Sequence, residues 1–120
     1  MKREFFLNKI AICVEFMQLF SIYLFYYLSL KMEKFVVFGN YCEEAIIKRE
    51  PFREQHLNRL KNLKDRNILV TLGPTKCTKY LFGIFNANDE KELIDLIEED
   101  IYWQKGIWTK YNVYPWIQAF

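Results

Sequence analysis

The chain contains one histidine, His56, within the charged stretch REQHL at residues 53–57. Imidazole is the side chain best suited to accept and return a proton near neutral pH. For this work it needs a partner, often a carboxylate that orients the ring and stabilises the imidazolium. Asp100 is the carboxylate that the predicted topology brings to His56. A His/Asp pair for acid–base chemistry is therefore the first functional hypothesis.

The elements that must position this pair are predicted from apolar periodicity. Short apolar runs closed by Gly, Asn or Pro predict strands over residues 33–39, 67–74, 79–85 and 107–120. One helix is predicted from Pro51, with leucines at helical spacing, after a separate helical turn over 42–49. A second is predicted over 88–100, with Asn88 or Asp89 as its cap.

The predicted order βαββαβ indicates an α+β fold, namely a ferredoxin-like antiparallel sheet with both helices on one face. The strands over 33–39 and 79–85 carry apolar side chains on both faces, yet two helices cover only one face. We therefore expect a homodimer packed through the open sheet face, a dimeric α/β barrel. The alternative is that residues 10–30 cover this face.

This topology gathers several candidate residues at one edge of the sheet. The start of the first helix, Gly73-Pro74 at the end of the second strand, and Asp100 at the end of the second helix meet there. The positive end of the first helix favours a neutral His56, which can accept a proton. The competing interpretation is that His56 is a packing residue beside the apolar helix stripe and Asp100 a solvated helix end.

Other side chains could complete a site at this edge. Arg49 and Arg53 could clamp an anionic ligand, or they could be surface charges on a helix. Aromatic side chains could line a pocket or serve core and dimer packing: Tyr102, Trp103, Trp108 and Trp116. Cys77, in a predicted turn without an assigned base, is interpreted as incidental.

Composition excludes several classes of function. Of 17 basic and 15 acidic side chains, four and two lie in residues 1–31, which leaves 13 of each in the rest of the chain. Residues 32–120 therefore have no net charge and lack the positively charged surface that nucleic-acid binding requires. The three cysteines are odd in number and have no C-x-x-C spacing, which argues against a disulfide framework and favours a reducing compartment. The single histidine argues against a Cys/His zinc site. No cofactor or metal is predicted, and the expected location is cytoplasmic.

Residues 1–31 form a separate hydrophobic extension ahead of a domain over residues 32–120. From residue 10 to residue 30 only Glu15 and Gln18 are strongly polar, and this length approaches that of a bilayer span. The segment is interpreted as a misassigned start upstream of Met32, as a membrane anchor over residues 10–30, or as a processed leader. The anchor alternative makes the protein membrane-bound.

The segment from Met32 to Phe120 resembles the YciI-like (YCII-related) proteins. The resemblance rests on Arg53-x-x-His56-Leu57, Gly73-Pro74, Asp100-x-Tyr102 followed by Gly106, and Pro115-Trp116. It implies a dimeric ferredoxin-like barrel with a pocket at the His/Asp edge. His56 and Asp100 match the proposed active-site pair of that family, and Arg53 matches a basic group that could hold a carboxylate.

The same resemblance implies an activity only broadly. A few members are similar to dehydrochlorinases, which eliminate HCl from chlorinated muconolactone-type acids, and most have no known substrate. Two features depart from the family: Ile101 replaces the usual proline after the aspartate, and residues 1–31 have no counterpart.

The resulting prediction is a small enzyme, a lyase or hydrolase, that abstracts a proton from a small anionic organic acid or eliminates a group from it. His56 and Asp100 are its catalytic residues, and Arg53, Arg49, Gly73, Pro74 and Tyr102 bind the substrate. The alternative is a non-catalytic dimeric ligand-binding or accessory module in which His56 is structural.

Overall fold

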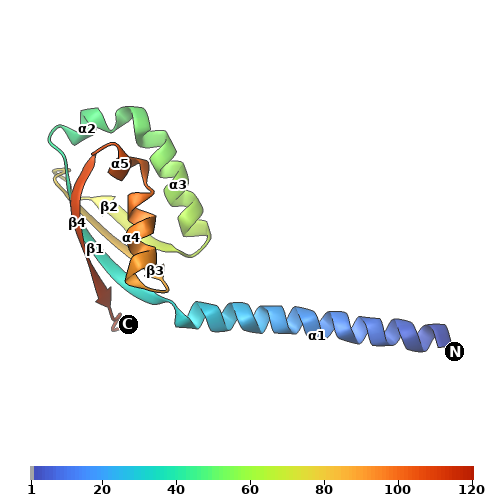
Figure 1. Cartoon of the computed structure of the whole chain (residues 1–120). Helices are drawn as coiled ribbons and strands as arrows, with labels where there is room; N and C mark the ends of the chain where they lie inside the picture. The colour runs from blue at the N-terminus through green and yellow to red at the C-terminus, as the bar shows by residue number, and fades with distance from the viewer. Residues whose placement is uncertain (1) are drawn as a thin grey trace. The chain divides into compact units, whose positions relative to one another are not determined.

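The structure is a computed structural model that describes the backbone of residues 2–120 and the side chains of residues 9, 11–24, 26 and 32–120. The chain divides into two compact units, with the boundary between Lys31 and Met32. The first unit is one helix, α1 (Lys2–Lys31). The second unit begins at Met32 and contains all the strands of the described chain (Figure 1).

Helix α1 contains the apolar run for which a membrane anchor over residues 10–30 was one alternative. Across the described residues, no helix is both long enough and apolar enough to cross a bilayer. Glu15 and Gln18 interrupt the run, and a charged side chain in the middle of a span is costly.

The second unit alternates strands with helices on the pattern predicted from sequence (Figure 1). Its elements are β1 (Glu33–Tyr41), α2 (Ala45–Lys48), the 3₁₀ turn η1 (Glu50–Phe52), α3 (Arg53–Asp65), β2 (Leu69–Pro74), β3 (Tyr80–Ala87), α4 (Glu90–Glu98), α5 (Ile101–Gln104) and β4 (Trp108–Trp116). The sheet order is β2-β3-β1-β4, and each neighbouring pair is antiparallel. This arrangement confirms the ferredoxin-like α+β fold.

Alternation along the strands separates the two faces of the sheet. In β1, Phe35 and Val37 are buried against the core, whereas Phe38 is 50% exposed. In β3, Leu81 is buried and its neighbour Phe82 is 39% exposed. The buried face packs against apolar side chains of the helices, among them Leu63 of α3 and Leu93 and Ile97 of α4. The opposite face of the sheet keeps large apolar side chains in solvent.

The predicted helix over residues 88–100 starts as expected but is interrupted. Asp89 caps α4, because its Oδ1 accepts a hydrogen bond from the Glu92 backbone N–H at 2.8 Å. The helix then ends at Glu98, so the prediction of one continuous helix is wrong at this end. Asp100 has extended backbone and caps the separate helix α5. A short polar side chain that bonds the following backbone competes with helix continuation.

A steric constraint set by the backbone lies at Gly39, between β1 and β4. A Cβ added there would lie 2.8 Å from the carbonyl oxygen of Lys110, a backbone atom that cannot move without separating the strands. We expect Gly39→Ala to lower the free energy of unfolding by roughly 1–3 kcal/mol, measured by urea denaturation. Gly73→Ala is the control, because an added Cβ has nothing within 4 Å. Equal losses in both variants would contradict this account.

Candidate active site

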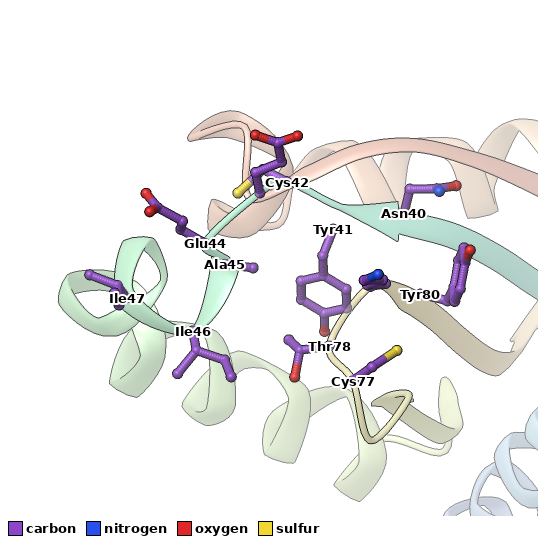
Figure 2. Close-up of a pocket in the computed structure, with 12 residues that line it drawn as sticks. Asn40, Tyr41, Cys42, Glu44, Ala45, Ile46, Ile47, Cys77, Thr78 and Tyr80 are labelled. Atoms are coloured by element: carbon purple, nitrogen blue, oxygen red, sulfur yellow. The ribbon is translucent and has the colours of Figure 1, made fainter.

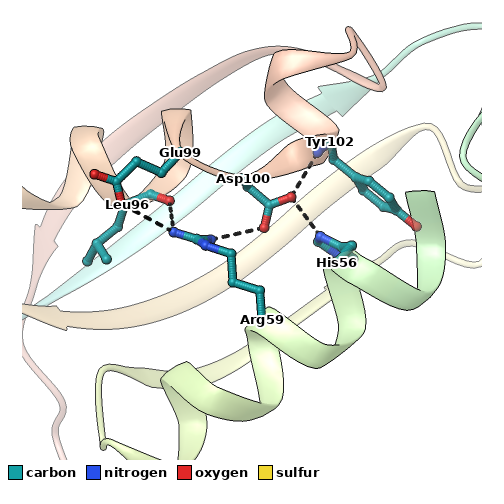
Figure 3. Close-up of polar contacts among 6 residues, drawn as sticks. All are labelled: His56, Arg59, Leu96, Glu99, Asp100 and Tyr102. Atoms are coloured by element: carbon teal, nitrogen blue, oxygen red, sulfur yellow. Dashed lines mark hydrogen bonds and ion pairs between the residues drawn. The ribbon is translucent and has the colours of Figure 1, made fainter.

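His56 and Asp100 meet at the corner between α3 and the α4–α5 connection (Figure 3). The Nδ1 atom of His56 donates to Oδ1 of Asp100 at 2.7 Å. The two residues are 4% and 0% exposed. The structure therefore brings together the two residues that the sequence analysis proposed as the catalytic pair. Because Nδ1 bonds to the carboxylate, Nε2 is the ring nitrogen available to a bound molecule.

Two further donors satisfy the Asp100 carboxylate. The Tyr102 backbone N–H donates to Oδ1 at 2.9 Å, and Arg59 Nη1 donates to Oδ2 at 3.0 Å. Arg59 is itself fixed, because its Nη2 donates to the Leu96 carbonyl oxygen at 2.7 Å. A buried charge is tolerated only with such compensation. Asp100 is thus held at both oxygens (Figure 3).

Arg59 is a component of the site that sequence reasoning missed. It lies three residues after His56 on α3, so the two side chains share one helix face. Its spacing from His56 was the available signal, but an arginine among the charges of this helix has the pattern of a surface residue. The structure shows that its guanidinium belongs to the Asp100 network, because α4 packs close enough for the Leu96 carbonyl to bind it.

Aromatic contacts fix the plane of the His56 ring. The Tyr102 ring stacks on it, with centroids 3.7 Å apart and an interplanar angle of 9°. Trp108 meets it edge-on, with centroids 5.2 Å apart. The imidazole is therefore fixed by one face contact, one edge contact and one charged hydrogen bond. Such a ring has a single orientation to present to a ligand.

His56 lines a cavity of about 140 Å³ between α3, β1, β2 and α5. Every residue predicted to bind the substrate also lines it: Arg49, Arg53, Gly73, Pro74 and Tyr102. Asp100 does not line the cavity and lies behind the imidazole as its hydrogen-bond partner. Tyr41 of β1, which was not proposed as a site residue, lines the cavity as well.

The cavity is electrostatically suited to an anion. Arg49 and Arg53 line it, and no carboxylate does. Within the described part of the chain, the buried Nε of Arg49 has no hydrogen-bond partner. Burial raises the pKa of the Tyr41 phenol and that of Tyr102, and the charge of Arg49 opposes this rise in both. Both phenols are therefore neutral donors at physiological pH.

The remaining aromatic candidates lie elsewhere. Trp103 packs edge-on against Tyr111, with ring centroids 5.1 Å apart. Trp116 lies near the end of β4 and is 37% exposed. Trp108 is buried and touches His56 without lining the cavity. Trp103 and Trp108 belong to the packed core, whereas Trp116 lines a separate surface cavity at the end of β4.

The comparison with protein families matches residues 33–117 to the YCII-related domain. The chain belongs to the YCII-related domain family. This confirms the resemblance derived from the histidine, aspartate and Gly-Pro motifs. The match covers the second unit apart from its ends.

A solved structure shares the fold of this YCII-related domain. It is a 5-chloro-2-hydroxyhydroquinone dehydrochlorinase from Burkholderia phenoliruptrix AC1100 in complex with 2,5-dihydroxybenzoquinone. The two chains are 21% identical, with a TM-score of 0.63 over 72% of this chain and 95% of the other. The comparison with curated proteins gave no match.

The Asp100 network makes a prediction about stability. Asp100→Ala leaves the Arg59 guanidinium and the His56 N–H without their buried acceptor. We expect a loss of about 3–5 kcal/mol in the free energy of unfolding, measured by urea denaturation. Glu99→Ala removes the neighbouring carboxylate, which is exposed and 3.8 Å from Arg59, and we expect a change within about 0.5 kcal/mol. Similar small effects in both variants would refute the role of Asp100 as the centre of the network.

Proposed function

We propose that this YCII-related protein is a small lyase in which His56 abstracts a proton from an organic acid. The observation that carries the proposal is the buried His56–Asp100 pair, whose imidazole lines a cavity together with two arginines. Asp100 orients the ring and stabilises the imidazolium that forms when the proton is taken. Arg49 and Arg53 bind the carboxylate or a developing enolate.

The reaction is an elimination that needs no oxidant or second substrate. Nε2 of His56 takes a proton from the carbon next to the carbon that bears the leaving group. The electron pair of the C–H bond becomes the second bond between the two carbons, and the leaving group departs with its own bonding pair. Loss of chloride in this way amounts to loss of HCl. The proton then passes from His56 to water.

Two findings support an elimination over other acid–base reactions. The chain belongs to the YCII-related family, and a protein of the same fold is a dehydrochlorinase by name. That protein is 21% identical, so its substrate is not carried over to this chain. The supported class is a small anionic acid with an acidic C–H bond beside a leaving group such as chloride.

A non-catalytic binding module is the second candidate. The observation in its favour is the packing of His56, which is 4% exposed and stacked on Tyr102. A buried, stacked ring of this kind also stabilises the packing between α3 and α5 without any role in catalysis. In this alternative the arginine cavity binds an anion without turnover.

We also propose that the protein works as a homodimer joined through the outer sheet face. Phe38 and Phe82 are opposite each other on β1 and β3, with ring centroids 5.3 Å apart, and Tyr114 of β4 extends the cluster. These rings are 39–54% exposed. Contiguous exposed aromatic surface on an open sheet is typical of an interface, and a second copy supplies the same surface.

His56→Gln tests the lyase against the binding module. A general base contributes about 10²–10⁴-fold, so we expect at least a 100-fold lower rate of chloride release from β-chlorinated carboxylic acids. The released chloride is measured with an ion-selective electrode, and circular dichroism shows whether the variant is folded. Gln55→Ala, an exposed neighbour on α3, is the control and retains the wild-type rate. An unchanged rate in His56→Gln would favour the binding module.

Phe38→Glu tests the dimer. A half-exposed position tolerates the charge in a monomer, whereas a buried interface does not. We expect sedimentation velocity to give twice the chain mass for the wild type and the single chain mass for the variant. Ile117→Glu, at a position 92% exposed near the C-terminus, remains dimeric as the matched control. A monomeric wild type would refute the proposal.

A further inference from the structure

A second and larger cavity adjoins the His56 site. It is a groove of about 710 Å³ between the end of β1, α2 and the turn before β3 (Figure 2). Cavities that bind small molecules commonly measure about 300–1,000 Å³, so the groove lies within this range and the 140 Å³ cavity below it. The smaller cavity accommodates only part of an ordinary ligand.

The floor and walls of the groove are mostly apolar. Ala45, Ile46 and Ile47 contribute from α2, and Tyr80 contributes from β3 (Figure 2). Ile46 is 57% exposed, Ile47 is 74% exposed and Tyr80 is 53% exposed. Large apolar side chains gathered around one hollow and open to solvent mark a binding surface.

The groove and the His56 cavity share a wall. Tyr41 lines both, and its ring extends from β1 toward Thr78 (Figure 2). Arg49, which lines the smaller cavity, directly follows α2 and donates its backbone N–H to the Ala45 carbonyl oxygen at 2.9 Å. Tyr41 therefore borders both cavities, and Arg49 of the smaller cavity directly follows the helix that lines the groove.

The charges of the two cavities indicate which end of the ligand lies in which cavity. The smaller cavity has two guanidinium groups and no carboxylate, whereas Glu43 and Glu44 line the groove together with Lys79. An anionic head is repelled by the two groove carboxylates and attracted by the two arginines. The apolar part of the ligand is consequently the part that fits the groove.

The backbone around the groove is unusual. Among the non-glycine residues with positive φ in the described chain, Glu44 and Thr78 both have φ of 56° and both line the groove. For a β-branched residue such as Thr78 this conformation is rare, and such outliers gather at functional sites. The observation supports a binding role that the apolar lining and the shared wall already indicate.

We infer that the substrate is an organic acid with an apolar chain or ring, and that the groove is the subsite for that apolar part. The carboxylate lies against Arg49 and Arg53 beside His56, and the remainder passes Tyr41 onto Ile46 and Ile47. This inference rests on the proposed function of the smaller cavity and adds the class of substrate to it.

A chain-length series tests the subsite. Butanoate, hexanoate and octanoate are titrated by calorimetry, and the imidazole signals of His56 are followed by NMR, which the single histidine makes unambiguous. We expect the affinity to rise about twofold to fourfold with each added methylene group. Ile46→Asn removes most of this rise, so that octanoate binds the variant little tighter than butanoate does. Ile117→Asn, a matched exposed isoleucine away from the groove, retains the full rise.

The outcomes separate the subsite from the proposed function. Arg49→Gln is expected to weaken all three acids by a similar factor, because it acts on the head alone. If octanoate binds no tighter than butanoate while both shift the His56 signals, the subsite is overturned and the anion cavity stands. If no acid binds and the His56 signals do not move, the proposed function fails and the subsite fails with it.

Discussion

The structure of the second unit depends on how the Asp100 carboxylate is compensated. Its charge is fully buried, and a buried charge is tolerated only when hydrogen-bond donors surround it. The donors come from a helix distant in sequence, through His56 and Arg59, and from the backbone of Tyr102. Helix α3 must therefore lie against the α4–α5 corner. The cavity beside His56 exists because these elements are held there.

Sequence patterns predicted most of the fold because alternation in strands is a local property. The exposed Phe38 beside the buried Val37 follows directly from a period of two residues. The end of α4 was predicted wrongly, since helical periodicity continues through Asp100. The side chain of Asp100 instead bonds the Tyr102 N–H and begins a new helix. Ile101 is the first residue of α5, and the first residue of a helix is a position where the proline usual in the family would also fit.

The site was predictable where topology alone brings residues together and unpredictable where packing decides. The pairing of His56 with Asp100 follows from the order of strands and helices. The role of Arg59 does not, because an arginine on a charged helix has no pattern that separates a buried contact from a solvated one. The groove beside Tyr41 could not be predicted either. It forms where α2 approaches the turn before β3, and this distance depends on side-chain packing between segments far apart in the chain.

The Asp100 carboxylate joins the stability of this fold to the geometry of its candidate site. The same carboxylate begins a helix, holds Arg59 and orients His56, so a substitution of Asp100 alters the fold and the His56 cavity together. Arg49, Arg53 and the α2 side chains line the two cavities without binding the Asp100 carboxylate, so these positions can be varied without breaking its network.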